Sequence, residues 1–306
     1  MFERICGTFT SLLVLWVLLL CGIGYAWPEA LIWMKPYLEY FFMFTMLGIG
    51  LVLNPGDFSH VLKKPLDVVL GSAAQYIIMP FLGWLIAKAL NLPAPLALGL
   101  IMAGAAPGAM ASNVISYLAK ADTAYSIAVT TTTTFIAPVM TPALVLFYGS
   151  TYIKLEFMPM FRSIMLMVIV PLAAGLLIKK IAGKKVERLA PLFPAFSTLF
   201  IAFIIGLVLA LNKKYIMRVS AVIFIAVALQ NLAGMAAGYA AGMLFKFGEK
   251  MKRTLTFEVG MQNAGLGAVL ALKHLSPEAA LPNALFAVWC VISASVLANL
   301  WAKRPV

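Results

Sequence analysis

The chain has 306 residues, of which 63% are hydrophobic and only 11% are charged, and its formal net charge is +12. Soluble domains average about 45–50% apolar and about 25% charged residues, so this composition excludes an ordinary soluble enzyme or binding domain. The basic residues lie in loops between apolar runs, a pattern that indicates membrane topology and not nucleic-acid binding.

Ten apolar runs follow one another along the chain, and each is long enough for a helix of about 20 residues that crosses a bilayer. The predicted spans are residues 8–26, 37–54, 66–89, 95–119, 123–148, 161–181, 192–211, 217–245, 252–273 and 279–301. Turn-forming residues separate several spans, at Asn54–Asp57, Leu92–Pro95, Gly183–Lys185 and Ser276–Pro277. The sequence therefore predicts an all-α membrane protein with ten transmembrane helices.

The basic residues also indicate the orientation of these spans. With ten spans, the loops on the side of the termini hold 15 of the 23 Lys and Arg residues, and the opposite loops hold eight. Because loops rich in Lys and Arg stay in the cytoplasm, both termini are predicted to be cytoplasmic. The first run follows Arg4 as a signal peptide does, but Gly24–Trp27 is a poor cleavage site, and we expect the run to be retained.

The two halves of the chain, residues 1–150 and 151–306, echo each other. Gln75 in the third span corresponds to Gln230 in the eighth, at an offset of 230 − 75 = 155 residues. Asn113 in the fourth corresponds to Asn263 in the ninth, at an offset of 263 − 113 = 150 residues, and both lie among helix-breaking residues. Five spans per half is an odd number, so the second repeat is predicted to be inverted. Paired, interrupted spans in inverted repeats point to a transporter site, although glycine and proline are common enough in membrane helices for chance to remain an alternative.

Glu258 is the acidic residue that lies deepest in an apolar run, in the ninth span. A carboxylate there costs roughly 2.5–3.5 kcal/mol on insertion scales and usually serves a function. Such a carboxylate can form a structural ion pair, bind a cation or relay a proton. The predicted spans have no Lys or Arg near their middle, which disfavours the ion pair. The neighbouring Gln262 and Asn263 add oxygen atoms, which suit a hard cation such as Na⁺.

Other polar residues fit the same interpretation. Pro107 interrupts the fourth span just before Ser112 and Asn113, which frees carbonyls for a cation and begins a half-helix whose amides favour an anion. Ser126 and Thr130, four residues apart, share one helix face. The alternatives are a kinked packing helix at Pro107, hydroxyls bonded to their own helix, and, for Gln75, an amide that holds two helices together.

Two motifs carry a resemblance to a known family. They are Ala106-Pro107-Gly108, which leads into Ser112-Asn113, and the run Glu258-Val259-Gly260-Met261-Gln262-Asn263-Ala264-Gly265-Leu266. With these motifs, the chain resembles the bile acid:sodium symporter family in its bacterial ten-helix form, over essentially its whole length. The resemblance implies a panel domain of spans 1, 2, 6 and 7, and a core domain of spans 3–5 and 8–10. It also implies that spans four and nine are broken and cross each other.

The resemblance further implies two sodium sites and one substrate site. The first Na⁺ is expected at Ser112, Asn113, Ser126, Thr130 and Glu258. The second Na⁺ is expected at Gln75, Glu258, Gln262 and the carbonyls of Val259 and Met261. The organic anion is expected between panel and core, at Asn263, Met110 and Ala111, with Val291 at the border of the cavity. Val291 and Ala109 depart from the usual family pattern, which leaves the substrate open. No other metal or cofactor is expected.

The resulting interpretation is a sodium-coupled symporter of an organic anion, a bile acid or a smaller carboxylate, which works by alternating access. The alternative is a proton-coupled carrier that uses Glu258 as its relay. A passive channel is a further alternative, and an enzyme is disfavoured because the spans carry no mid-span His or Cys–His arrangement. We expect a monomer in a bacterial inner membrane, with Na⁺, an organic anion and the lipid bilayer as partners and no nucleic acid.

Overall fold

The computed structural model of the protein describes residues 12–53, 64–183 and 192–304. These residues form helices and connecting turns, with one isolated β-bridge. The chain divides into two compact units: unit 1 comprises Met1–Asn54 and Phe161–Arg218, and unit 2 comprises Pro55–Met160 and Val219–Val306. The start of the first predicted span, the turn at Asn54–Asp57, and Lys184 and Lys185 lie outside the described residues.

Unit 1 is built on two helix pairs. Its long helices are α2 (Leu13–Ala26), α4 (Leu38–Val52), α11 (Val170–Ala182) and α13 (Leu192–Leu211). Helix α13 packs along α2, and α11 packs along α4. A Cβ atom built on Gly50 would lie 2.2 Å from the carbonyl oxygen of Leu172, so only glycine permits this approach of α4 to α11. Small residues at such crossings are the usual means by which membrane helices come close together.

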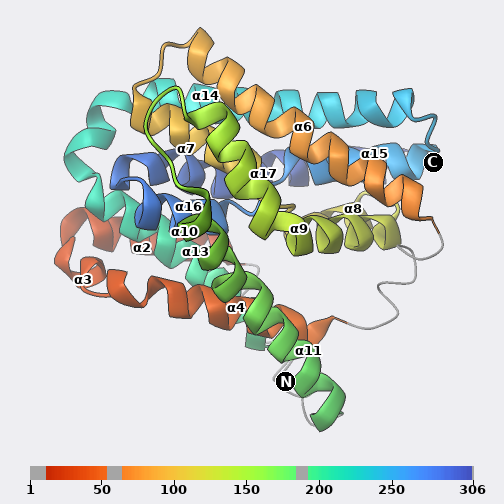
Figure 1. Cartoon of the computed structure of the whole chain (residues 1–306), viewed down its shortest axis with the longest axis horizontal. Coiled ribbons are helices and arrows are strands. Elements are labelled where there is room, and N and C mark those ends of the chain that lie inside the picture. The colour runs from red at the N-terminus through yellow and green to blue at the C-terminus, as the bar shows by residue number, and fades with distance from the viewer. Residues whose placement is uncertain (1–11, 54–63, 184–191, 305–306) are drawn as a thin grey trace. The chain divides into compact units, whose positions relative to one another are not determined.

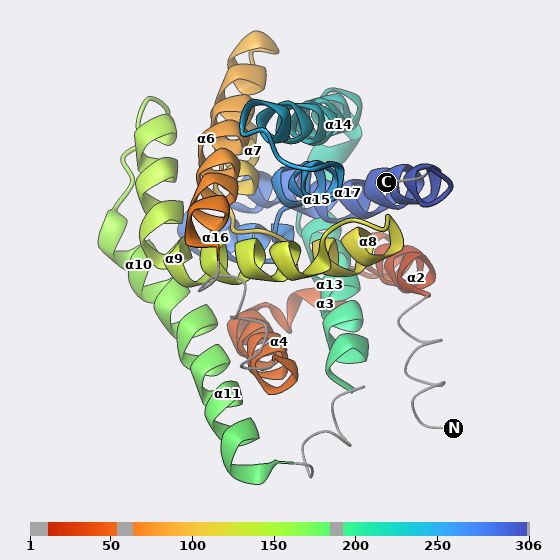
Figure 2. The ribbon, with the colours of Figure 1, turned by 90° about the vertical axis from the view of Figure 1, so that its right-hand side faces the viewer.

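Unit 2 carries the polar residues that the sequence singles out. Its helices are α6 (Pro65–Ala89), α7 (Ala94–Ala105), α8 (Ala111–Leu118), α9 (Thr123–Gly149), most of α14 (Lys213–Leu244), α15 (Glu249–Gly260), α16 (Ala264–His274) and α17 (Pro277–Ala302). Helix α7 contacts α6, α9, α16 and α17, and nearly all of its residues are buried. Figures 1 and 2 both show α7 beside α6. The centre of this unit is therefore occupied by one half of a broken span.

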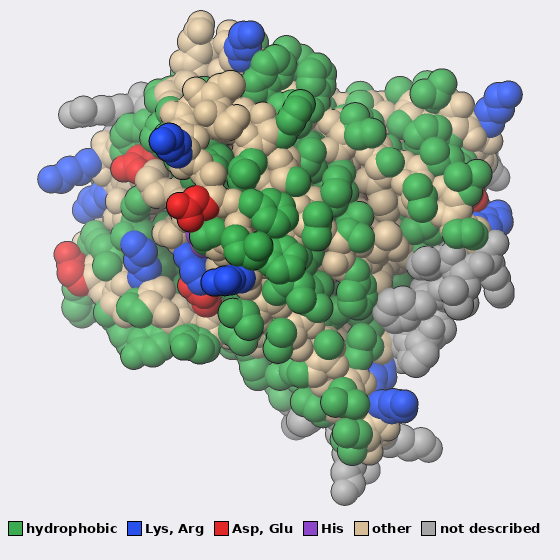
Figure 3. All heavy atoms as spheres, in the orientation of Figure 1, with side chains coloured by type: hydrophobic (Ala, Val, Ile, Leu, Met, Phe, Trp, Pro, Cys, Tyr) green, Lys and Arg blue, Asp and Glu red, His purple; other side chains and the backbone are tan. Residues whose placement is uncertain are grey.

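The helices of the described residues have membrane character. Six of them are long and apolar enough to cross a bilayer individually, and the bent segments Leu15–Ala26 and Glu29–Val52 pass the same test together. Large apolar side chains stay exposed on unit 2, among them Val69 and Ile77 on α6 and Phe147 on α9. Figure 3 shows such apolar side chains across the viewed face of α6 and α9. A multi-pass membrane protein follows, while the arrangement as ten spans in two inverted repeats remains a prediction.

The predicted breaks in spans four and nine are present. Helix α7 ends at Ala105 and α8 begins at Ala111, and helix α15 ends at Gly260 and α16 begins at Ala264. The first break contains Pro107, whose nitrogen has no proton for the helical hydrogen bond. The second break contains no proline, and the side chain of Asn263 starts the new helix by accepting a hydrogen bond from the amide of Leu266 at 3.1 Å.

The structure corrects three predicted boundaries. Span six was expected at 161–181, but helix begins at Phe157 and contains a π turn, η3 (Met165–Ile169), between α10 (Phe157–Ile164) and α11. The π turn precedes Pro171, whose ring crowds the preceding turn and whose nitrogen cannot donate. Span nine was expected from 252, and span eight from 217, but their polar first turns are helical too, because no proline or glycine interrupts them. The short helices α3 (Glu29–Ile32) and η1 (Lys35–Tyr37) were not expected.

Candidate functional site

The two breaks lie against each other within unit 2. Gly108 and Gln262 form an antiparallel bridge. The amide of Asn263 donates to the carbonyl of Pro107 at 2.8 Å, and the amide of Ala109 donates to the carbonyl of Met261 at 3.3 Å. Backbone groups that the breaks release from their own helices thus bond across to the other broken span. The crossing of the two broken helices is therefore a hydrogen-bonded junction.

Glu258 lies one turn before this junction, near the end of α15, and has no exposed surface. Its Oε1 accepts hydrogen bonds from the Oγ atoms of Ser112 and Ser126, each at 2.5 Å. Its Oε2 accepts one from Oγ1 of Thr130 at 2.7 Å. Ser126 and Thr130 lie one turn apart on α9, and Ser112 lies in the first turn of α8. Two helices, α8 and α9, therefore bring three hydroxyl groups to one buried carboxylate on α15.

Asn113 completes this group, which we call the Glu258 cluster (Ser112, Asn113, Ser126, Thr130 and Glu258). Its Oδ1 lies 2.8 Å from Oγ of Ser126 and 3.4 Å from Oγ1 of Thr130. The carbonyl of Ala109 lies 2.7 Å from Oγ of Ser112. Three hydroxyl protons thus face four acceptor oxygens, namely two of the carboxylate, Oδ1 of Asn113 and the Ala109 carbonyl. Such a surplus of buried acceptor oxygens with a negative charge suits a hard cation.

No basic side chain neutralises Glu258 among the described residues. The ion pairs within α15 instead join Glu249 to Lys252 and to Arg253, at 3.3 and 3.4 Å. A buried carboxylate without a partner of opposite charge is strongly disfavoured unless hydrogen bonds or a bound cation compensate it. The ion-pair alternative is therefore excluded for this part of the chain, and hydroxyl donors take its place.

Gln75 lies on the other side of Gly108, where α6 passes the junction. Its Nε2 donates to Oε1 of Gln262 at 3.2 Å and lies 3.4 Å from the carbonyl of Ala106. Its Oε1 is fully buried and has no hydrogen-bond partner in the structure. A buried amide oxygen without a donor is costly, and a cation bound beside it would satisfy it.

The space beside Gly108 is lined with oxygen atoms. A Cβ atom built on Gly108 would lie 3.2 Å from Oε2 of Glu258, 3.4 Å from Oε1 of Gln75 and 3.5 Å from Oγ1 of Thr133. These oxygens come from α15, α6 and α9, and the missing side chain of Gly108 leaves the point between them free. We call Gln75, Gln262 and Glu258 around this point the Gln75 cluster.

The carbonyls of Val259 and Met261, which the sequence interpretation assigns to the second ion, lie at the same junction. The Val259 carbonyl accepts from Nε2 of Gln262 at 2.7 Å. The Met261 carbonyl accepts from the amide of Ala109 at 3.3 Å. A carbonyl oxygen has two lone pairs, so each of these groups retains one for a further partner.

The four residues predicted for the substrate lie in unit 2. Asn263 is half-buried and uses its Oδ1 as the cap of α16. Met110 is the cap residue of α8, and Ala111, its first residue, is exposed. Val291 is half-buried on α17. Their part in substrate binding stays a prediction, and three of them, Met110, Ala111 and Asn263, stand at the amino ends of the half-helices.

Sequence reasoning missed two residues that support the junction. Oγ1 of Thr133 accepts from the amide of Gly108 at 3.3 Å. Nδ2 of Asn231 donates to the carbonyl of Gly260 at 2.7 Å, and Oγ of Ser293 donates to Oδ1 of Asn231 at 2.6 Å. Asn231 follows Gln230, so its place in an apolar run beside a singled-out amide was a usable signal. Thr133 stands in the run of threonines on α9, where nothing distinguishes it from its neighbours.

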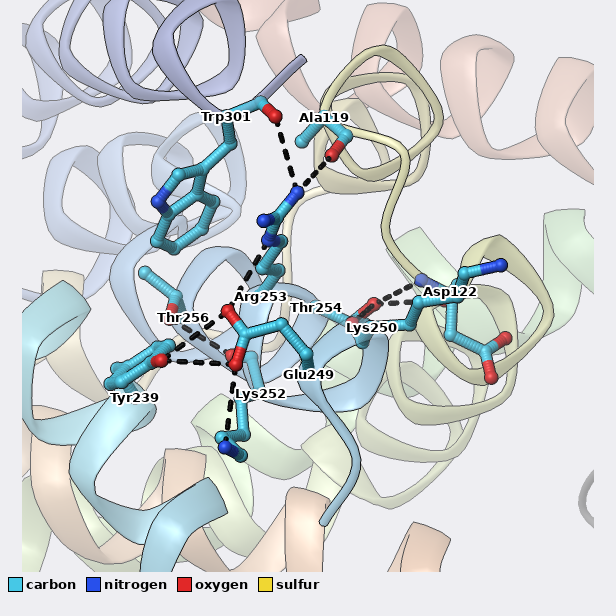
Figure 4. Close-up of polar contacts among 10 residues, drawn as sticks. All are labelled: Ala119, Asp122, Tyr239, Glu249, Lys250, Lys252, Arg253, Thr254, Thr256 and Trp301. Carbon is cyan, nitrogen blue, oxygen red and sulfur yellow. Dashed lines mark hydrogen bonds and ion pairs between the residues drawn. The ribbon is translucent and has the colours of Figure 1, made fainter. Parts of the chain in front are cut away.

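Sequence reasoning also missed the network at the amino end of α15 (Figure 4). Arg253 is only 3% exposed, and its Nη1 donates to the carbonyls of Trp301 at 3.2 Å and Ala119 at 3.4 Å. Burial raises the pKa of Glu249, but hydrogen bonds from Tyr239, Lys252 and Arg253 outweigh burial and hold this pKa below its ordinary value. Glu249 is therefore the charged partner of Arg253 at neutral pH.

Comparisons with known proteins show which family the sequence resembles. Residues 40–219 match the sodium bile acid symporter family. The chain is 38% identical to the uncharacterized sodium-dependent transporter YocS of Bacillus subtilis over 290 residues. These residues are 95% of this chain and 90% of that protein. It is 34% identical to the probable sodium/metabolite cotransporter BASS2, chloroplastic, of Oryza sativa subsp. japonica over 305 residues. These residues are 99% of this chain and 73% of that protein.

A third relative, the probable sodium/metabolite cotransporter BASS1, chloroplastic, of Oryza sativa subsp. japonica, is 33% identical over 292 residues, which are 95% of this chain and 72% of the relative. These relatives are named as transporters and not as enzymes, in agreement with the interpretation of the sequence. The resemblance seen in the motifs is confirmed, and the protein belongs to the sodium bile acid symporter family of sodium-dependent transporters.

Proposed function

We propose that the protein is a sodium-coupled symporter of organic anions, either bile acids or smaller carboxylates, and that two Na⁺ ions couple its transport. The observation that carries the proposal is the buried carboxylate of Glu258, which hydroxyls from α8 and α9 surround and no basic side chain of the described residues pairs. The relatives named as sodium/metabolite cotransporters support a small organic substrate.

The two ions have different ligand sets in this proposal. One Na⁺ binds in the Glu258 cluster, where each hydroxyl can donate its proton and still offer a lone pair to the cation. The other binds in the Gln75 cluster beside Gly108, with further oxygens from the carbonyls of Val259 and Met261. Support for the second site comes from the unpartnered Oε1 of Gln75 and from the oxygens that surround Gly108. Glu258 faces both clusters and makes the two ions interdependent.

The anion would bind where the half-helices begin. Helices α8 and α16 start next to the junction, at Met110–Ala111 and at Asn263, and the positive end of a helix dipole favours a negative charge. Bound Na⁺ would neutralise Glu258 and thereby remove the repulsion between this carboxylate and an anionic substrate. Val291 borders this region in the proposal. The pair of ions thus makes anion binding favourable, which is the energetic requirement of symport.

We further propose an alternating-access cycle in a ten-span protein of two inverted repeats, with cytoplasmic termini, as a monomer in a bacterial inner membrane. In this proposal, a panel of spans 1, 2, 6 and 7 and a core of spans 3–5 and 8–10 are the moving parts. The contact-defined units support this division, because α2, α4, α11 and α13 belong to unit 1 and both broken spans belong to unit 2.

Replacing Na⁺ tests the proposal with the unaltered protein. Proteoliposomes are loaded and diluted so that an inward gradient of NaCl, or of choline chloride at the same pH, drives uptake of labelled carboxylates and bile acids. We expect accumulation above the external concentration with NaCl and none with choline. With the same inward proton gradient imposed in both salts, equal accumulation would favour the proton-coupled alternative, and equilibration without accumulation would indicate a passive channel.

Replacing Gln75 tests the second ion separately. We expect Gln75→Leu to lower the Hill coefficient for Na⁺ from near two towards one, because the variant loses one ligand set and keeps the Glu258 cluster. Ser72→Ala is the matched control, since Ser72 lies one turn earlier on α6, is buried, and has a hydroxyl without a partner in the structure. Na⁺ titrations of uptake measure the coefficient, and an unchanged value for Gln75→Leu would remove Gln75 from the ion site.

A further inference from the structure

The amino end of α15 is joined to the start of α9 by a side-chain tether at Thr254. The backbone amide of Asp122 donates to Oγ1 of Thr254 at 2.9 Å. The same hydroxyl lies 3.0 Å from the carbonyl of Asp122 and 3.1 Å from that of Lys250, and it donates its one proton to one of these oxygens. Figure 4 shows Thr254 between Asp122 and Lys250. Thr254 is fully buried, so water does not compete for these bonds.

The tether contacts Asp122, the residue that caps the first turn of α9. Asp122 is the cap residue of α9, its Oδ1 accepts from the amide of Tyr125 at 3.0 Å, and its carbonyl accepts the first helical hydrogen bond, from the amide of Ser126 at 3.0 Å. The amide of Asp122 also lies 3.3 Å from the carbonyl of Lys250. Thr254 thus contacts both the amide and the carbonyl of Asp122, the N-cap residue of α9.

The spacing of the tether matches the spacing of the Glu258 cluster. Ser126 follows Asp122 by four residues on α9, and Glu258 follows Thr254 by four residues on α15. Four residues correspond to about 6 Å and little more than one turn, so each pair lies on one face of its helix. The contacts of Asp122 with Thr254 and of Ser126 with Glu258 are therefore successive rungs between the same two helix faces.

A slip between these helices would break the cluster. A shift by one residue moves a side chain by about 1.5 Å along the helix axis and turns it by about 100°. The bonds from Ser126 and Thr130 to Glu258, at 2.5 and 2.7 Å, do not survive such a change. The neighbouring Arg253 also reaches the carbonyl of Ala119, where α8 ends, so the turn that leads from α8 into α9 is held at both of its ends.

We propose that Thr254 is a positioning residue for sodium: its tether to Asp122 sets the register of α9 against α15 and thereby holds Ser126 and Thr130 at Glu258. This inference rests on the proposed sodium-coupled function. It assigns Thr254 no direct contact with the ion or with the organic anion. Loss of the tether should therefore weaken Na⁺ binding while the affinity for the anion at saturating Na⁺ changes little.

The test compares variants of neighbouring threonines on α15. Thr254→Val keeps the shape and removes the hydroxyl, and we expect it to raise the half-saturating Na⁺ concentration roughly tenfold, the effect of one lost buried hydrogen bond. Thr254→Ser keeps the hydroxyl and should restore the wild-type value, with Thr254→Cys in between. Thr256→Val is the matched control, because Oγ1 of the buried Thr256 bonds only to the carbonyl of Lys252 in its own helix, at 3.0 Å.

Two readouts are taken for each variant: Na⁺ titration of uptake, and the rise in melting temperature of purified protein with NaCl relative to choline chloride. The expected order of Na⁺ affinity is Ser, then Cys, then Val, and the Cys variant keeps the order measurable if the Val variant is not recovered folded. Wild-type Na⁺ affinity in both the Cys and Val variants, with Glu258→Gln inactive, would overturn the tether and leave the proposed function intact. Full Na⁺ dependence in Glu258→Gln would overturn both.

Discussion

Glu258→Gln is expected to abolish sodium-driven uptake of the organic anion. The substitution keeps the size of the side chain and one carbonyl oxygen, but it removes the negative charge that both proposed ions share. A cation in a water-excluded site without a counter-charge is disfavoured by several kcal/mol, which corresponds to at least a thousandfold loss of affinity at about 1.4 kcal/mol per factor of ten. The amide nitrogen would also replace one acceptor oxygen, either the one that Ser112 and Ser126 share or the one that Thr130 uses.

Two measurements check this expectation. Uptake into proteoliposomes under a Na⁺ gradient should fall to the level of empty vesicles. The melting temperature of the purified variant should no longer rise with NaCl, because a ligand stabilises a protein only through its binding to the folded state. Glu278→Gln is the matched control, since Glu278 is a half-buried acidic residue of unit 2 in the first turn of α17. Sodium-dependent uptake by Glu258→Gln at the wild-type rate would contradict the proposed function.

Local sequence signals were sufficient for much of this site. The apolar runs predicted the positions of the long helices within a few residues, and Pro107 predicted the break in the fourth span. The spacing of Ser126 and Thr130 put both hydroxyls on one face of α9, where the structure indeed directs them to Glu258. Each of these inferences depends on residues close together in the chain, for which helix geometry alone determines the neighbours.

The parts that sequence reasoning missed depend on residues far apart in the chain. Thr254 and Asp122 are 132 residues apart, and neither stands out in its own segment. Arg253 is buried because its partners include backbone carbonyls at the ends of two other helices, which the local sequence around Arg253 does not reveal. The oxygens that line the space beside Gly108 come from three helices, so no single motif reveals them. Such contacts follow from tertiary packing, which a periodic pattern does not contain.

Gly108→Ala is expected to block the second ion while the protein still folds. The new methyl group would lie 3.2 Å from Oε2 of Glu258 and 3.4 Å from Oε1 of Gln75, beside the place proposed for Na⁺ in the Gln75 cluster. A methyl carbon at this point offers no lone pair and leaves no room for a cation between the two oxygens. The backbone of Gly108 has no positive φ angle, so alanine introduces no backbone strain there. The closer contact requires Oε2 of Glu258 to shift by a few tenths of an ångström.

The variant should therefore separate folding from ion binding. In choline chloride, we expect its melting temperature to stay within a few degrees of that of the unaltered protein, since one added methyl group in a packed interior costs about 1–3 kcal/mol. In NaCl, the variant should lose most of the rise in melting temperature that sodium causes in the unaltered protein. Sodium-driven uptake should fall by roughly a hundredfold, which corresponds to a loss of about 2.7 kcal/mol in the free energy of ion binding. Gly248→Ala is the control, because a Cβ atom there meets nothing within 4 Å. A Gly108→Ala protein with an unchanged Hill coefficient for Na⁺ would move the second ion away from the junction of the broken helices, because no cation fits beside that methyl group.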